Sequence, residues 1–101
     1  MLRWIDANLG AELDVAKLAR RAAMSPRTFL RRFQEQTGTS PARWVAEARV
    51  RRAQALLESS TLTVDEVAGA VGFGSGVTFR QRFAAVVGVS PQRYRRSFRA
   101  A

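Results

Sequence analysis

The chain contains one sequence pattern twice. The segments that begin at Val15 and at Val64 carry apolar residues, a glycine and a Ser-Pro pair in the same order. The matched residues are Val15, Leu18, Ala19, Phe29, Phe33, Gly38, Ser40, Pro41, Arg43 and Trp44 in the first copy, and Val64, Val67, Ala68, Phe79, Phe83, Gly88, Ser90, Pro91, Arg93 and Tyr94 in the second. The offset grows by one residue within a single turn, where Gly74 is extra. A duplicated unit of short helices constrains the fold more than any other feature.

Apolar residues recur at helical spacing along the chain, and no segment shows the alternation of a strand. Helix starts are indicated by Asp14, by Ser75 and by Ser-Pro pairs at Ser25, Ser40 and Ser90. Thr63 and Glu66 have the spacing of a capping box. We therefore predict an all-α fold of about seven helices, in which two helix-turn-helix subdomains are joined by a long central helix.

The expected division of the chain is residues 1–39 for the first subdomain, 40–59 for the connecting helix and 60–101 for the second subdomain. A short first helix is expected to carry Leu2, Ile5 and Leu9 and to end at Gly10. Besides the repeated apolar positions, the expected core contains Trp4, Ala22, Val45, Val50, Ala53, Leu56, Leu57, Val71, Phe73, Val86, Val87 and Phe98.

The composition favours a polyanionic partner. Lysine and arginine together number 17 against 8 acidic residues, which gives a net charge of +9, and all the basic residues except Lys17 are arginine. Arginine forms forked contacts with phosphate and guanine, so nucleic acid is favoured over an acidic membrane surface. The chain has no cysteine and no histidine, which excludes disulfides, zinc fingers and histidine catalysis. We expect a soluble cytoplasmic protein that needs no cofactor or metal.

A turn of three to four residues separates the two helices of each copy, at Ala23 to Ser25 and at Gly72 to Ser75. This spacing is typical of a helix-turn-helix motif, whose second helix enters the major groove of DNA. If the repeated phenylalanines point inward, the first turns of each second helix face outward. The base-reading candidates are Arg27, Thr28 and Arg31 in the first copy and Val77, Thr78 and Gln81 in the second. The candidates for phosphate contact are Ser25, Arg32, Ser75, Arg82, Arg93, Arg95 and Arg96.

The two copies are expected to differ in strength. Arg27 and Arg31 can each fork onto a guanine, whereas the Gly76-Val77 tip of the second copy cannot. The first copy should therefore discriminate sequence more, and the second should anchor more through phosphate and DNA shape. Ala23 stands where the second copy has Gly72, so the first turn is expected to be strained by up to about 1 kcal/mol.

Four arginines lie on the expected central helix. At least one of them is expected to have a structural role, folding back onto a helix end or onto a carboxylate such as Glu47. These arginines are Arg43, Arg49, Arg51 and Arg52.

Residues 13–33, 38–44, 71–83 and 88–95 together resemble the AraC/XylS family of bacterial transcription regulators. The sequence of these segments is similar to that of members with an N-terminal sensor domain that looks like a class-I glutamine amidotransferase. The resemblance implies two helix-turn-helix units that place helices in successive major grooves of promoter DNA, and it adds Leu30, Gly76 and Arg80 to the groove-facing positions. It also implies that an effector acts through a sensor domain outside this chain.

The leading interpretation is the DNA-binding output module of a transcription activator or repressor, with RNA polymerase as a further partner. The alternative is a protein-interaction module that contacts RNA polymerase and binds DNA only weakly and without selectivity. An enzyme is not supported, since the chain offers scattered carboxylates but no histidine, cysteine or phosphate-binding loop.

Overall fold

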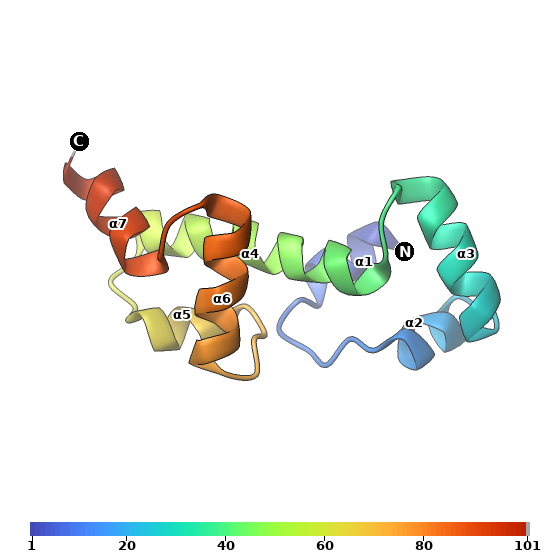
Figure 1. Cartoon of the computed structure of the whole chain (residues 1–101). Helices are drawn as coiled ribbons and strands as arrows, with labels where there is room; N and C mark the ends of the chain where they lie inside the picture. Colours follow the sequence, from blue (N-terminus) through green and yellow to red (C-terminus); the bar gives the residue numbers. More distant parts are fainter. Residues whose placement is uncertain (101) are drawn as a thin grey trace.

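The computed structural model describes residues 1–100, which form seven helices and no strand. The helices are α1 (Leu2–Ala7), α2 (Val15–Arg21), α3 (Pro26–Thr37), α4 (Pro41–Ser59), α5 (Val64–Ala70), α6 (Gly76–Val87) and α7 (Pro91–Ala100). The molecule is elongated, with extents of 47 × 22 × 22 Å, and α4 runs through its middle (Figure 1). The predicted all-α fold with two similar halves is confirmed.

The helix ends lie where the capping residues predict them. The Oγ atoms of Ser25, Ser40 and Ser75 each accept a hydrogen bond from the backbone N–H three residues further on, at 3.1–3.2 Å. Both halves of the Thr63–Glu66 capping box are formed. α3 and α6 end at Gly38 and Gly88, whose φ angles of 76° and 93° are in the left-handed region that glycine adopts without strain.

Each half of the molecule has its own hydrophobic core. The first core gathers Ile5, Leu9, Leu18, Ala19, Phe29, Phe33, Val45 and Ala48, and the second gathers Val50, Ala53, Leu57, Val67, Ala68, Val71, Phe79 and Phe83. α4 belongs to both, because its residues up to Ala48 face the first core and those from Val50 onward face the second. The position between these two residues is therefore the boundary between the halves.

Aromatic pairs repeat between the cores. In the first half Phe33 lies between Phe29 and Trp44, with ring centroids 5.7 and 6.0 Å away. In the second half Phe83 occupies the same place between Phe79 and Tyr94, at 5.7 and 5.6 Å. The start of α4 thus packs on α3 as α7 packs on α6. In both places the contact is made by the aromatic residue of the repeated Ser-Pro-x-Arg-aromatic motif.

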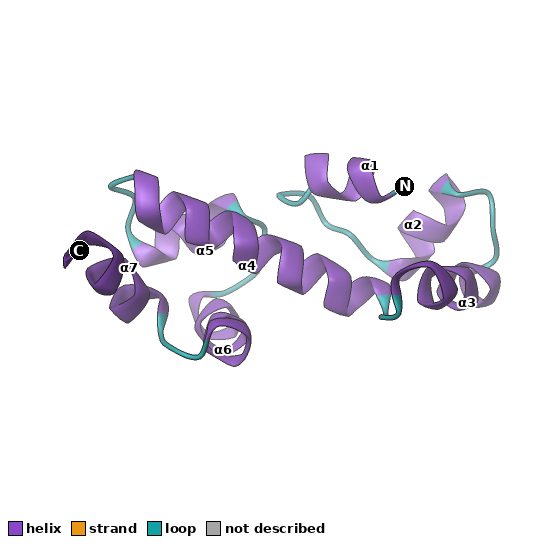
Figure 2. Ribbon diagram, turned by 90° about the horizontal axis from the view of Figure 1, so that it is seen from above, coloured by secondary structure: helices purple, strands orange, loops and turns teal. Residues whose placement is uncertain are grey.

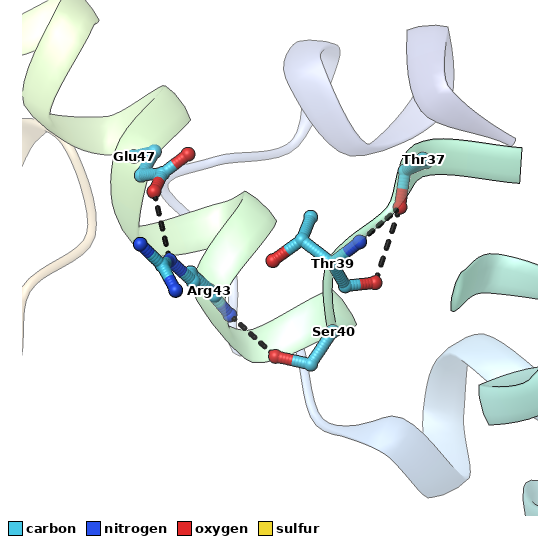
Figure 3. Close-up of polar contacts among 5 residues, drawn as sticks. All are labelled: Thr37, Thr39, Ser40, Arg43 and Glu47. Atoms are coloured by element: carbon cyan, nitrogen blue, oxygen red, sulfur yellow. Dashed lines mark hydrogen bonds and ion pairs between the residues drawn. The ribbon is translucent and has the colours of Figure 1, made fainter. Parts of the chain in front are cut away.

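The junction between α3 and α4 is held by short-range hydrogen bonds (Figure 3). The Thr37 hydroxyl lies 2.8 Å from the Phe33 carbonyl oxygen and 3.1 Å from that of Thr39, and it accepts a bond from the Thr39 N–H. The second half has Val87 at the position of Thr37, so its matching junction lacks these bonds. These bonds fix the conformation of the short connection between α3 and α4.

Three details differ from the sequence-based predictions. α1 ends at Ala7 rather than near Gly10, because the Asn8 side chain donates to the Trp4 carbonyl at 2.7 Å and closes the helix early. Val86 is 49% exposed and Phe98 is 50% exposed, so their assignment to the core was wrong. Val86 lies in an open depression between α4 and α6, and Phe98 lies near the C-terminal end of α7.

No helix within residues 1–100 has both the length and the apolar character needed to cross a bilayer.

Candidate nucleic-acid interface

α3 and α6 lie on the same side of the molecule. Figure 1 shows their axes running in similar directions, α6 across α4 and α3 just beyond its N-terminal end, and Figure 2, seen from above, shows both on the side of the molecule opposite to α1. Their burial patterns coincide from Phe29 and Phe79 onward, residue for residue through Ser40 and Ser90. The two helices therefore present equivalent faces to the same side.

The outward face of α3 carries two arginines. Arg27 and Arg31 are exposed, with Leu30 between them at 41% exposure. The Thr28 hydroxyl is half-buried and lies 3.0 Å from the Ser25 hydroxyl, so it belongs to the helix cap. The structure thus brings the four groove-facing candidates of the first unit together at the start of α3.

The outward face of α6 is less charged. Val77 is 67% exposed and Gln81 is exposed, and they occupy the positions that Arg27 and Arg31 hold in α3. Thr78 repeats the contact of Thr28, with its hydroxyl 3.0 Å from that of Ser75. Val77 and Gln81 can make apolar and amide contacts, but neither supplies the guanidinium group that arginine offers at these positions of α3.

Arg80 has a partner that the sequence analysis did not identify. Its Nη1 donates to Asp65 Oδ1 at 3.1 Å, which joins α6 to the first turn of α5. The pair lies over Gly76, where a Cβ atom would be only 2.6 Å from the carboxylate oxygen and 2.7 Å from the guanidinium. Both side chains are at least half exposed, so water screens the pair and leaves Arg80 able to exchange Asp65 for another anion.

The phosphate-contact candidates fall into two groups. Arg95 is half-buried and donates to the carbonyls of Leu57 and Ser60 at 3.2 and 3.4 Å, which stabilises the C-terminal end of α4. The other candidates are exposed: Ser25, Arg32, Ser75, Arg82, Arg93 and Arg96. Arg82 lies beside Arg43 and Glu47 in a shallow depression between α4 and α6.

The predicted structural arginines on α4 are present. Arg43 Nε donates to Glu47 Oε1 at 3.1 Å (Figure 3), and Arg49 donates to the carbonyls of Leu9 and Ala11. Burial lowers the pKa of Arg49 from its usual value. The prediction that at least one arginine of this helix folds back is therefore confirmed.

The two turns differ in strain as predicted. Ala23 has a φ of 56°, the only positive φ among the non-glycine residues described, while Gly72 occupies the matching place at 96°. Alanine in this region costs energy that glycine does not.

No group of three or more carboxylates within residues 1–100 is close enough to hold a metal ion.

Residues 18–97 match the family model described as a helix-turn-helix domain. The HTH-type transcriptional regulator Rv1931c of Mycobacterium tuberculosis is 43% identical over 89 residues, a stretch that covers 88% of this chain and 34% of the relative. The regulator GlxA of Rhizobium meliloti is 34% identical, with 95% of this chain and 30% of the relative covered. The chain spans about a third of the length of the curated relatives it matches.

Solved structures of transcription regulators have the same fold as this chain. The DNA-binding domain of the global transcriptional factor AdpA, crystallised with a target DNA, superposes with a TM-score of 0.96 at 47% identity, over 98% of this chain and 89% of that one. The C-terminal domain of AraT, a response regulator from Geobacillus stearothermophilus, gives 0.91 at 28% identity, over 95% and 80% of the two chains.

Proposed function

Because the chain belongs to the AraC/XylS family of bacterial regulators, as a sequence-specific DNA-binding domain and not an enzyme, we propose that it binds promoter DNA with α3 and α6 in successive major grooves. The observation that carries the proposal is the placement of these two helices on one side with matching positions turned outward. In a helix-turn-helix protein the second helix reads base edges with its first turns. Two such helices on one side fit two grooves on one face of a duplex.

In this proposal α3 supplies most of the sequence discrimination. Arg27 and Arg31 each reach a guanine O6 and N7, and Leu30 contacts a thymine methyl. Their exposure supports this assignment, since neither arginine is held by an ion pair within the described residues. Thr28 lies at the edge of the groove.

In this proposal α6 reads fewer bases than α3 and makes more phosphate contacts. Val77 contacts a thymine methyl, Gln81 reads an adenine, and Thr78 and Gly76 let the helix tip come close to the DNA. Ser75 and Arg82 bind phosphates on either side, and Arg80 exchanges Asp65 for a phosphate when DNA arrives. In the first unit Arg32 binds a phosphate, as Arg82 does in the second.

The remaining phosphate contacts come from α7. Arg93 and Arg96 are exposed and supply positive charge beside the second unit. Arg95 contributes mainly by holding α7 to the end of α4, because its guanidinium already binds two carbonyls.

The length of α4 bears on the shape of the bound DNA. Its 19 residues span about 29 Å at 1.5 Å per residue, while successive major grooves are about 34 Å apart. We propose that the DNA bends toward the protein or that α6 inserts only in part. A circular-permutation gel assay on a selected operator tests this, and straight DNA protected equally in both grooves would contradict it.

Selection of bound duplexes from a random library is the primary test. We expect an enriched motif of two half-sites about one helical turn apart, with the more strongly specified half under α3. With a net charge of +9, affinity for that motif should fall with salt at a log–log slope between about −5 and −9. Recovery of no motif, or a flat salt dependence, would favour an interaction module whose DNA binding is secondary.

We further propose that the chain is the output part of a longer cytoplasmic regulator. The covered share of its relatives, about a third, supports a larger protein. Its sensor domain would take the effector, and the resemblance noted in the sequence suggests an amidotransferase-like type. RNA polymerase would meet the side of α1, α2 and α5 that faces away from DNA, and a pull-down with and without operator DNA tests that contact.

A further inference from the structure

Arg49 lies at the boundary between the two halves of the molecule. It stands on α4 between Ala48, the last α4 residue of the first core, and Val50, the first of the second core. Its Nε donates to the Leu9 carbonyl at 3.0 Å and its Nη2 to the Ala11 carbonyl at 2.9 Å. Both carbonyls belong to the connection between α1 and α2, so one guanidinium ties the first unit's loop to the middle of α4.

The turn before α6, which belongs to the second unit, also lies against Arg49 and the Leu9 carbonyl. A Cβ atom on Gly72 would lie 2.1 Å from the Leu9 carbonyl oxygen and 2.9 Å from Arg49 Nε, so only a glycine fits there. Nearby, Gly10 approaches the Ala70 carbonyl, 3.5 Å from where its Cβ would be. In Figure 1 the α1–α2 connection and the α5–α6 turn face each other next to α4.

Little else joins the two units. Their cores are separate, and within residues 1–100 the substantial helix packing occurs inside each unit or against α4. Without a further contact, their relative orientation would depend on α4 and on how firmly each unit holds it. An arginine suits this place because its planar fork carries two donors in fixed geometry, whereas a lysine offers one compact charge.

We propose that Arg49, the Leu9 and Ala11 carbonyls and Gly72 form a joint that sets the orientation of α3 relative to α6. The joint thereby determines which spacing between half-sites the protein accepts. Arg49 is a positioning residue, since its guanidinium binds two backbone carbonyls and it acts through the two reading helices. The spacing role rests on the proposed function, while the orientation role does not.

Orientation is measured on the free protein. The chain has no cysteine, so Glu35→Cys and Ala85→Cys, exposed at matched positions of α3 and α6, accept spin labels selectively. We expect a narrow distance distribution with Arg49, a broad one with Arg49→Met and an intermediate one with Arg49→Lys. Arg52→Met, exposed on the same helix, is the control and should leave the distribution narrow. A narrow, unshifted distribution in Arg49→Met would overturn the joint.

Spacing is measured on the selected operator and on versions with one base pair inserted or deleted between half-sites. One base pair rotates the half-sites by about a tenth of a turn, so the protein with Arg49 should lose about tenfold or more in affinity. Arg49→Met should bind the original operator more weakly and lose less than about threefold on the altered ones. Its affinity for a single half-site should be unchanged.

The two measurements separate the possible failures. If no duplex is bound specifically, the proposed function fails, and the distance distributions still decide the joint. If Arg49→Met broadens the distribution but keeps the full spacing penalty, the joint exists and its role in spacing is wrong. Circular dichroism of each variant verifies that the helices are intact.

Discussion

The two helix-turn-helix units share a frame and differ in what they expose. The α2–α3 unit presents Arg27 and Arg31, while the α5–α6 unit presents Val77 and Gln81 at the same positions of the same kind of helix. Within the repeated segments the buried residues match: Leu18, Ala19, Phe29 and Phe33 in the first unit, and Val67, Ala68, Phe79 and Phe83 in the second. The two phenylalanine rings of each unit lie 5.7 Å apart. Duplication has therefore kept the residues that fold each unit and changed those that face outward, so the units fold alike but should bind unequally.

The turns give the largest expected difference. Gly72→Ala should lower the free energy of unfolding by about 2 kcal/mol or more, because it adds a left-handed alanine and a Cβ atom in contact with the Leu9 carbonyl. Gly74→Ala in the same turn is the control, since open space surrounds it and its φ is not positive. Urea unfolding measures both. Equal losses would mean that the contact with Leu9 does not matter.

The reading faces give the next largest difference. Arg31→Ala should cost about 1–3 kcal/mol of operator binding and relax preference at one or two base pairs. Gln81→Ala, at the matched position of α6, should cost less than about 1 kcal/mol, because an amide makes a weaker contact than a charged fork. Titrations on operator and on random duplex measure both.

Two further variants separate base reading from phosphate contact. Arg32→Ala and Arg82→Ala should weaken binding to operator and random duplex alike, as expected of phosphate contacts. If Arg31→Ala also lost the same amount on both duplexes, the unequal division of work between the units would be wrong.

Most of this frame could be predicted from the sequence, because its signals are local. Caps such as Ser25 and Ser75, and the Thr63–Glu66 box, act within three residues and lie where the pattern placed them. The spacing of the phenylalanines likewise gave the inner faces of α3 and α6. The division at residues 39 and 59 stays a prediction, although α4 contributes to both cores.

What could not be predicted depends on distant contacts or on where neighbours end. Helical spacing placed Val86 and Phe98 inside, but only the packing of neighbouring helices decides whether an inner face is covered. The partners of Arg49 lie about 40 residues back in the chain. Asp65 and Arg80 are 15 residues apart, and only the packing of α6 on α5 brings them together.

Ala23 offers a smaller test, with the opposite sign from Gly72. Ala23→Gly should raise the free energy of unfolding by about 0.5–1 kcal/mol, since it removes the strain of an alanine at a φ of 56°. The gain is reduced by the greater freedom of glycine in the unfolded chain. Thermal melts measured beside Ala22→Gly, where φ is −83°, isolate the strain, because the control should only lose stability.

Helix capping gives the smallest expected difference between the units. The N-cap of α2 is Asp14, with Lys17 three residues further on, whereas the N-cap of α5 is Thr63, with Glu66 at the matching position. The Thr63 N–H donates to Glu66 Oε1 at 2.8 Å, and this bond lowers the pKa of the Glu66 carboxyl below its ordinary 4.5. A carboxyl whose pKa is lower in the folded state stabilises the fold above its unfolded pKa, and it loses that contribution as the pH falls through the folded value.

Glu66→Gln tests this contrast. Glutamine keeps the hydrogen-bonding geometry of the capping box but has no charge, so stability at pH 7 should fall slightly and its decline below about pH 4.5 should become shallower. Urea unfolding at a series of pH values from 7 to about 3 compares the variant with the parent chain, and Glu12→Gln, in the loop before α2, is the matched control. The control should leave the slope unchanged because Glu12 lies outside any helix. Parallel stability curves for parent and Glu66→Gln would show that the charge of Glu66 does not contribute, and that the two units are capped to the same effect.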